Sequence, residues 1–578
     1  MKSGKGYLYG TMVLGIGTIA VKIIGAVFKI PLTNLLGGVG MSYFNVAYDL
    51  YYPLCALFIS GVPAALSKLI SENIACGRVQ DAKRLLHIAL LAFTGIGLAG
   101  TVFMIWGAEW FVCLIDNPQA QAAVIMLAPS LLFGCIMACL RGYWQGNQDM
   151  APTAKSQVVE AAAKLFFGLF FAYWAARSGI KEYLSYGTVF GTPCDSMEQA
   201  RLAVLPRSAA GAVLGVTCST ICGVIYLLWY HKCQNKNRIS PSGQHFTIPA
   251  SKRKLLTQLF QIAAPVCLAS VISNLTSFID LISVMNRLSA AIQQDGARIL
   301  SMYPDAIPGG IGMGQLASYL YGCYSGLAVP VYNLIPSITT VVGISMLPAL
   351  SSAKAVGNMK RVSVTLESSL RISALFAFPA GFGVCALAEP ILRLLYFSKP
   401  MEVTVIAPAL RLMGISAVFV SLVLPINAAL QAMGRADLPV KLLLAGGAFK
   451  LVCNYLLVGV PRLNIQAAPV GTLACYLFVL CAGLCALLDI SQAKLPVVSV
   501  FGKPMLAGAG CALSAWQGYL LFNKMLPSEA ATLLGIAIGG LVFLILVFSL
   551  RILKKEDVFM VPNGEKFANL LEKHHFLG

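Results

Sequence analysis

Long apolar runs separated by short polar connections occupy almost the whole chain. A helix that crosses a bilayer needs about 20 predominantly apolar residues, and fourteen runs approach that length. Backbone groups in lipid must be paired internally, and the runs are too long for barrel strands, so the pattern predicts an all-α polytopic membrane protein. The expected spans lie near 8–31, 43–67, 85–108, 121–140, 156–176, 208–230, 255–284, 318–349, 368–388, 404–428, 442–460, 468–490, 504–522 and 531–550.

Two connections carry related motifs, which predicts an internal duplication. Equivalent positions are 285 to 287 residues apart, and both copies fall on the same expected side of the membrane, so the repeat is parallel. These cytoplasmic loop motifs comprise Arg141, Gln145, Gly146 and Pro152 in the first copy and Gln431, Gly434 and Pro439 in the second. The duplication predicts two six-helix lobes around a central cavity, with two further helices after them. The expected parts are lobes 1–231 and 255–490, a basic linker 232–254, spans 13 and 14 in 491–550, and a tail 551–578.

Composition supports the membrane prediction. Hydrophobic residues make up 58% of the 578 residues, charged residues only 11%, and mean hydropathy is +0.78. Soluble chains carry about 25% charged residues, so a cytosolic enzyme, a disordered protein and a secreted disulfide scaffold are excluded. The 17 Cys stand mostly alone in apolar runs and no metal-ligand spacing occurs, so we expect no metal, no cofactor and no catalytic constellation.

The net charge of +19 is largely explained by topology. One set of connections, with both chain ends, holds 27 of the 42 Lys and Arg, and the opposite set holds 11. Basic residues favour the cytoplasmic side, so we expect both termini to be cytoplasmic and no nucleic-acid partner. The linker 232–254 is the most basic connection; it is interpreted as a positive-inside linker, with docking of anionic lipid headgroups as the lesser alternative.

Four lysines remain inside the expected spans. Lys22 and Lys29 lie on one helix face in the first span, with Thr11, Gly15, Thr18 and Gly25. A cation in hydrocarbon costs at least about 2.5–3.5 kcal/mol. Lys29 could snorkel toward the outer face, whereas Lys22 lies too deep to do so easily, which makes Lys22 the strongest candidate for a cavity-facing cation.

Polar stripes on three other spans match this one. Asn45 and Asp49 lie in the second span, Asp280 follows a serine stripe in the seventh, and Asn333 begins a stripe in the eighth. The duplication relates these four helices in pairs, so we expect them to face a common cavity in which Lys22, Lys29, Asp49, Asn45 and Asn333 contact the substrate. Asp49 could pair with Lys29, and packing of small polar residues is an equal alternative for the serine stripe.

The other two intramembrane lysines occupy repeat-equivalent positions. Lys164 has Glu160 one turn away, which could neutralise it, and Lys450 has Asn454 one turn away, which cannot. With Asp280 these residues are interpreted as coupling or structural charges, and a structural role within each lobe is favoured for both lysines. Asp280 and Lys450 are expected at different depths and so not to pair.

Three stretches carry a family resemblance: Gly61-Val-Pro-Ala-Ala-Leu-Ser-Lys68, the segment from Arg141 to Gln157, and Leu430-Gln-Ala-Met-Gly-Arg-Ala-Asp-Leu-Pro439. They resemble the stage V sporulation protein B-like polysaccharide transporters of the multidrug/oligosaccharidyl-lipid/polysaccharide exporter superfamily, which are similar to the peptidoglycan lipid II flippases. The resemblance implies fourteen helices, residence in the bacterial cytoplasmic membrane and a cationic cavity. Lys22 and Lys29 resemble a stretch where lipid II flippases place two Arg, and Asp49 stands where another Arg is expected.

The leading hypothesis is therefore a monomeric flippase, working by alternating access. Its cargo would be an undecaprenyl-diphosphate-linked oligosaccharide or a peptidoglycan precursor, moved from the inner to the outer leaflet, with cell-envelope synthesis enzymes as partners. H⁺ and Na⁺ are both compatible coupling ions. The alternatives are a cation-coupled multidrug exporter of the same superfamily and a non-transporting scaffold for cell-wall or spore-envelope synthesis.

Overall fold

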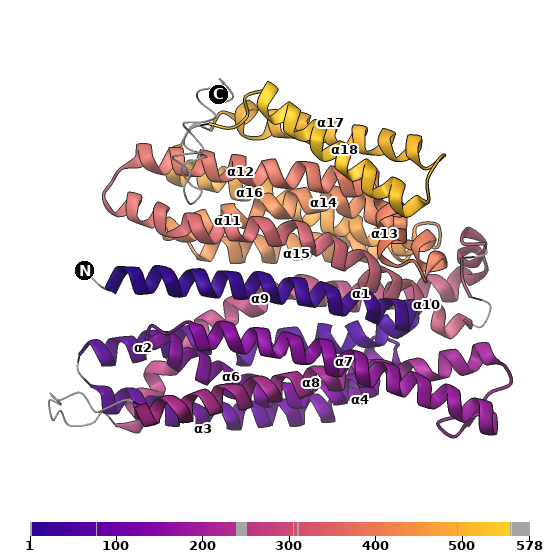
Figure 1. The fold of residues 1–578 in the computed structure, drawn as a ribbon, viewed down its shortest axis with the longest axis horizontal. Helices are drawn as coiled ribbons and strands as arrows, with labels where there is room; N and C mark the ends of the chain where they lie inside the picture. The colour runs from indigo at the N-terminus through magenta and orange to yellow at the C-terminus, as the bar shows by residue number, and fades with distance from the viewer. Residues whose placement is uncertain are drawn as a thin grey trace. The chain divides into compact units, whose positions relative to one another are not determined.

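The computed structural model describes residues 3–76, 78–237, 251–304, 306–308, 311–493, 495–554 and 557. Most of this part of the chain is helical, which confirms the all-α polytopic class (Figure 1). Eleven helices among the described residues are long and apolar enough to cross a membrane. Each of the fourteen expected spans falls on helix, but the count of fourteen and the fold symmetry stay predictions.

The chain forms two compact units. The first comprises Met1–Met285 and Gly309–Gly322, and the second comprises Asn286–Pro308 and Cys323–Gly578. Their division falls within one long helix, α9, and not in the expected linker. The lobes 1–231 and 255–490 therefore remain a prediction, as does the linker, of which 238–250 lies outside the described residues.

The first unit is built from long helices and a small hairpin. Its helices are α1 (Ser3–Phe58), α2 (Val62–Ala75), α3 (Val79–Trp106), α4 (Ala108–Leu114), α5 (Gln121–Leu127), α6 (Pro129–Gly146), α7 (Ala151–Tyr186), α8 (Met197–Asn237), the first part of α9 (Lys252–Met302) and α10 (Met313–Cys323). A 3₁₀ turn, η1 (Pro118–Ala120), precedes α5, and strands β1 (Thr188–Val189) and β2 (Thr192–Pro193) join α7 to α8.

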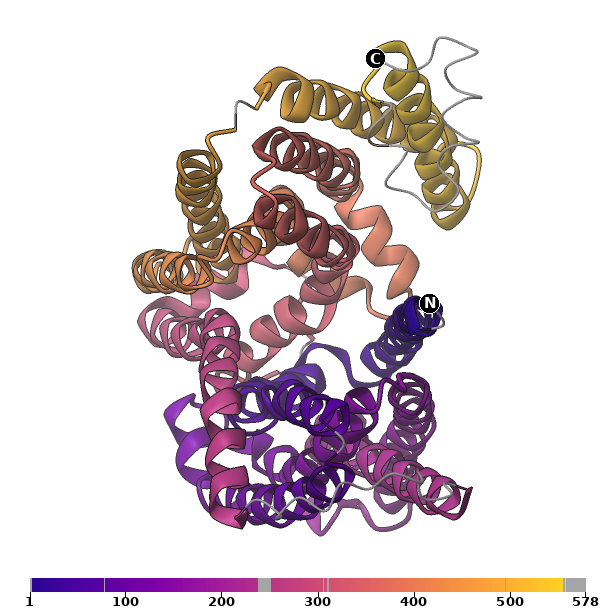
Figure 2. The ribbon, with the colours of Figure 1, turned by 90° about the vertical axis from the view of Figure 1, so that its left-hand side faces the viewer.

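The second unit continues with helices alone. After a π-helical turn, η2 (Tyr324–Ala328), come α11 (Val329–Ala355), α12 (Met359–Ala386), α13 (Ala388–Leu395), α14 (Pro400–Ala432), α15 (Asp437–Leu457), η3 (Asn464–Ala467), α16 (Ala468–Ser491), η4 (Val498–Gly502), α17 (Lys503–Phe522) and α18 (Ser528–Ser549). Figures 1 and 2 both show α17 and α18 side by side as a helical pair. Of the expected tail, 551–554 and 557 are described.

Small residues set the closest helix contacts. A Cβ at Gly215 of α8 would overlap the backbone of Gly168 in α7, so only glycines allow this approach. Without a hydrophobic driving force in lipid, such close packing is a main source of helix association. The long α7–α8 pair is therefore fixed by its small residues.

Two long connections expected on the outer side of the membrane are partly helical, so this part of the prediction is wrong. The segment near 177–207 is mostly the end of α7 and the start of α8, and α9 continues to Met302 inside the connection expected near 286–317. The sequence prediction ended these spans at their first polar residues. A helix can continue beyond the membrane, where water solvates its charged side chains.

Glu182 of α7 accepts hydrogen bonds from Thr188 Oγ1 (3.0 Å) and Gly191 N (2.9 Å), which holds the hairpin against the helix end.

In each unit, the segments that carry the repeated motifs pack against each other. In the first, a Cβ at Gly142 would meet Pro63 Cα at 2.9 Å and one at Gly146 would meet the Ser67 carbonyl oxygen at 2.9 Å, so α6 lies tightly on α2. In the second, Leu350 of α11 and Leu430 of α14 share one buried core cluster. Both pairs of motifs are thus helix-packing surfaces.

Candidate functional site

The cytoplasmic loop motifs lie largely on helices. Arg141, Gln145 and Gly146 belong to the last turns of α6, and Gln431 belongs to the end of α14. The expectation that these four occupy loops is wrong, because each helix runs on to the polar residues that follow its apolar stretch.

The remaining motif residues mark where the next helix starts. Pro152 and Pro439 lie in the first turns of α7 and α15, where a missing N–H costs nothing. Gly434 adopts a φ of 77° between α14 and α15. Its neighbour Met433 accepts a hydrogen bond from Lys354 Nζ (2.5 Å), which ties the end of α11 to this turn.

A break in α1 brings two expected cavity residues together. Gly37 has φ 63° and ψ −170°, so α1 consists of two arms. Lys29 on the first arm donates a hydrogen bond to Asn45 Oδ1 on the second at 3.4 Å. In a straight helix these residues would be about 24 Å apart along the axis. The left-handed glycine therefore creates this contact.

Asp49, one turn beyond Asn45, is held by a residue from α10. Tyr321 donates its hydroxyl to Asp49 Oδ2 at 2.8 Å, and Tyr321 itself is buried. The helices touch closely, since a Cβ at Gly322 would overlap the Gly38 carbonyl oxygen. Asp49 and Lys29, expected as a possible pair, have different hydrogen-bond partners.

Lys164 completes this group through aromatic rings. Its ammonium lies 5.1 Å from the ring centroid of Phe28 and 4.8 Å from that of Tyr48, both on α1. Cation–π contacts contribute about 0.5–2 kcal/mol. We call Lys29, Asn45, Asp49, Lys164 and Tyr321 the Lys29 cluster.

The direct ion pair of Glu160 is with Arg141, and Glu160 acts on Lys164 only through its charge. Arg141 donates to Glu160 Oε2 at 2.9 Å and to Ser156 Oγ at 2.9 Å, so Glu160 has its own cation from α6. This ion pair joins α6 to α7. Arg141 itself gains a structural role at the helix end.

Two further charged candidates, Lys22 and Asp280, belong to the first unit. Lys22 is exposed and lies seven residues before Lys29, hence on the same face of α1. Asp280 of α9 is half-buried, and its charge acts on Asp49 electrostatically, as does that of Lys29. The backbone of α1 is described at Thr11 and Thr18, but their side chains are not.

Candidates in the second unit are of two kinds. Lys450 and Asn454 of α15 are buried (3% and 0% exposed), and Gly471 of α16 packs directly on Asn454. Asn333 of α11 is exposed. The burial of Lys450 and Asn454 agrees with a structural role inside their own unit, whereas Asn333 remains a candidate contact for substrate.

An ion-pair network that the sequence did not indicate lies at one end of the second unit. Arg371, 1% exposed, donates to both carboxylate oxygens of Asp557 (2.7 and 2.8 Å) and to Glu367 Oε1 (2.8 Å). Lys554 also donates to Glu367 (2.5 Å). This Arg371 network (Arg371, Glu367, Lys554 and Asp557) ties the segment after α18 to α12. Arg371 and Asp557 are 186 residues apart, so no local pattern predicts the pair.

Within the described residues, no three side chains of His, Cys, Asp or Glu come together to hold a metal ion. The Lys29 cluster instead offers ammonium, amide, carboxylate and phenol groups, of which all but the phenol of Tyr321 lie on candidate membrane spans. Such groups can bind an anionic or hydroxyl-rich headgroup by charge-assisted hydrogen bonds.

Two family models match the chain. Residues 7–189 match the model described as polysaccharide biosynthesis protein, and residues 315–478 match that of the lipid II flippase MurJ. The chain is 25% identical to the lipid II flippase MurJ of Bacillus subtilis (strain 168), over 82% of this chain and 81% of that protein. The predicted family resemblance is confirmed.

Two further similarities extend this relationship over nearly the full length. Stage V sporulation protein B of Bacillus subtilis (strain 168) is 23% identical, over 96% of this chain and 98% of that protein. A solved structure of lipid II flippase MurJ in an inward closed conformation matches with a TM-score of 0.62 and 17% identity, over 93% of this chain and 98% of that one. The chain therefore shares the fold of that flippase structure.

Proposed function

We propose that this protein is a flippase that moves an anionic lipid-linked saccharide from the inner to the outer leaflet by alternating access. The cargo class is an undecaprenyl-diphosphate-linked oligosaccharide or a peptidoglycan precursor resembling lipid II. Relatives named as lipid II flippase and stage V sporulation protein B support the class of transporter. They leave the glycan open.

The observation that carries the proposal is the kind of partner given to two intramembrane cations. Lys29 is satisfied by an amide oxygen and Lys164 by two aromatic rings. A cation kept in a span at a cost of at least about 2.5–3.5 kcal/mol and not cancelled by a direct ion pair is suited to meet a diphosphate. Carboxylates rather than lysines would be expected to dominate if the cargo were a cationic drug.

The driving force follows from the charge of the cargo. An inside-negative potential favours outward movement of an anionic headgroup by about 2.3 kcal/mol per charge per 100 mV. The polyprenyl tail can stay in lipid while the headgroup crosses. H⁺ or Na⁺ coupling would add to this force, and both fit the charged groups present.

The test is a flipping measurement with the purified full chain in vesicles that contain a fluorescent lipid-linked precursor. Lys22→Ala is expected to abolish outward delivery while the variant still reaches the membrane. In cells, depletion of the protein should cause lipid-linked precursor to accumulate inside. Accumulation of a cationic dye with normal precursor export would favour the exporter alternative, and normal delivery by Lys22→Ala would remove Lys22 from the site.

A further inference from the structure

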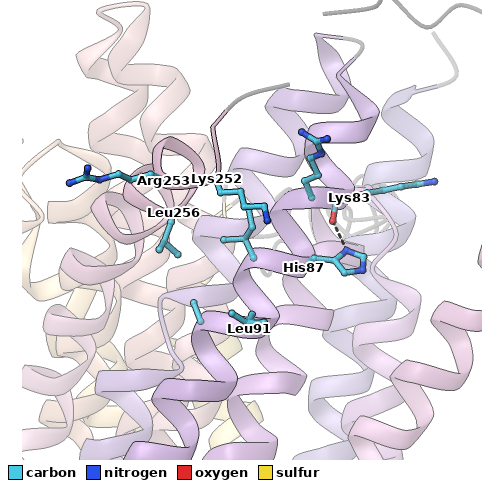
Figure 3. Close-up of a pocket in the computed structure, with 9 residues that line it drawn as sticks. Lys83, His87, Leu91, Lys252, Arg253 and Leu256 are labelled. Atoms are coloured by element: carbon cyan, nitrogen blue, oxygen red, sulfur yellow. Dashed lines mark hydrogen bonds between the residues drawn. The ribbon is translucent and has the colours of Figure 1, made fainter. Parts of the chain in front are cut away.

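A basic and apolar cavity lies between α3 and the start of α9 in the first unit (Figure 3). Its volume is about 570 Å³ and nine residues line it. None of them belongs to the Lys29 cluster. The proposed transport function therefore leaves this cavity without a role.

One end of the cavity is strongly cationic. Lys83 and Arg84 lie in the first turns of α3, Lys252 and Arg253 begin α9, and all four are exposed. In Figure 3 Lys252 extends from α9 toward α3, whereas Arg253 turns away. The described residues that line the cavity include no carboxylate, so nothing in the lining cancels these charges.

A histidine lies just below the basic residues. His87 Nδ1 donates a hydrogen bond to the backbone carbonyl of Lys83 at 3.0 Å, because a carbonyl oxygen can only accept. The hydrogen bond holds the ring near the ammonium groups and leaves Nε2 without its proton in the neutral ring. A water or a protonated headgroup oxygen could therefore donate to Nε2, next to the cations.

The other end of the cavity is apolar. Leu91 is 82% exposed and lines the cavity with Leu256 of α9. Leu91 lies eight residues, about 12 Å, further along α3 than Lys83. The two helices touch nearby, where the Phe93 and Phe260 rings stack at 5.6 Å. The cavity thus has charged residues near the helix ends and an apolar lining toward the middle of the helices.

We propose that this cavity binds one anionic phospholipid, with its phosphate among Lys83, Arg84 and Lys252 and an acyl chain along Leu91 and Leu256. The charge order matches that of such a lipid: headgroup anions at the interface and hydrocarbon below. A soluble anion would make no apolar contact with the exposed leucines, and a neutral lipid would leave the cations of the cavity without an anionic partner. The Lys and Arg distribution predicts this end to be cytoplasmic, so the lipid belongs to the inner leaflet.

Lipid binding is measured by native mass spectrometry of the full chain, delipidated in neutral detergent and titrated with phosphatidylglycerol or phosphatidylcholine of equal chain length. Phosphatidylglycerol should bind about tenfold or more tightly, since each interfacial basic residue contributes about 1 kcal/mol. The variant Lys83→Gln/Arg84→Gln/Lys252→Gln should lose this preference. A matched variant with three exposed basic residues elsewhere, Lys155→Gln/Lys360→Gln/Arg361→Gln, should keep it.

Further variants separate the sources of binding. Lys83→Arg/Lys252→Arg keeps the charges and should keep the preference for phosphatidylglycerol. Leu91→Gln/Leu256→Gln should weaken the binding of long-chain phosphatidylglycerol but leave the binding of dihexanoyl phosphatidylglycerol unchanged. Unchanged preference in the triple Gln variant would overturn the proposal. Full competition by glycerol phosphate would assign the site to a soluble anion, and tighter binding of a lipid-linked precursor than of phosphatidylglycerol would assign it to the transported substrate. Both results contradict a phospholipid site, and neither depends on whether flipping is observed.

Discussion

The Lys29 cluster and the Arg371 network treat buried charge in opposite ways. Arg371 is surrounded by acids and gives two hydrogen bonds to Asp557 and one to Glu367. Lys29 and Lys164 receive an amide and two aromatic rings as direct partners. The first region pairs its cations with carboxylates by direct contact. In the second, the two lysines contact neutral groups, and the carboxylate of Asp49 accepts its hydrogen bond from Tyr321.

This difference separates a stabilising role from a binding role. A buried cation that is fully paired in the protein has little attraction left for a ligand, and removing one partner exposes an uncompensated charge. A cation satisfied by neutral dipoles or rings keeps its field and can still attract an anion. The comparison therefore predicts that substitutions in the Arg371 network change stability and that substitutions in the Lys29 cluster change transport.

The largest effect should come from Arg371→Leu. It leaves the buried Asp557 without its guanidinium partner, which costs about 3–5 kcal/mol, while Glu367 keeps its hydrogen bond from Lys554. Thermal unfolding of the purified protein in detergent should show a much lower midpoint, while flipping per folded molecule stays near that of the parent chain. Arg393→Leu is the matched control, because its pair with Glu389 is half-exposed (48% and 38%) and should contribute about 0–1 kcal/mol. Equal stability of Arg371→Leu and the parent would contradict the assigned role.

A smaller free-energy change, but a clear functional one, is expected for Lys29→Gln. A hydrogen bond to a charged group contributes about 1.5–3 kcal/mol, so flipping of the lipid-linked precursor should fall about tenfold or more. The neutral amide can still bond to Asn45, so the unfolding midpoint should change little. Lys29→Arg retains the charge and should retain most of the activity. Lys155→Gln serves as a control, since Lys155 is exposed.

Loss of stability without loss of transport in Lys29→Gln would reverse the comparison. Lys29 would then belong with the structural charges, and the search for headgroup contacts would move to Lys22 and Asn333. The same measurement on Lys164→Gln would show whether its rings or the substrate satisfy that lysine.

The helical class could be predicted from the sequence because the thickness of the bilayer sets the length of the apolar runs. An unpaired backbone group in hydrocarbon is too costly for any other arrangement of long apolar runs. Helix ends were less predictable: Arg141 and Gln145 interrupt the apolar pattern, yet α6 continues through them, since a carboxylate from α7 pairs with Arg141. The partner that decides the boundary lies on another helix, where no local pattern records it.

The site was predicted in part for the same reason. Lys22, Lys29 and Asp49 were found because charges in apolar runs are rare and expensive. Tyr321 and Tyr48 were missed because an aromatic residue in an apolar run looks like core. Gly37 lies in the connection expected between the first two spans, so a break near it was predictable. The contact that the break creates between Lys29 and Asn45 depends on the fold and was not predictable.

The smallest expected effect is that of Tyr321→Phe, which removes only the hydroxyl donated to Asp49. An ordinary hydrogen bond contributes about 0.5–1.5 kcal/mol, so flipping should fall by a factor of about 2 to 10, less than for Lys29→Gln. The buried ring is kept, so stability should change less than for Arg371→Leu. Tyr319→Phe is the matched control, a buried tyrosine on the same helix. If Tyr321→Phe lowered the unfolding midpoint as far as Arg371→Leu, the Asp49 contact would be a structural pair, and the Lys29 cluster would lose one of the features that set it apart.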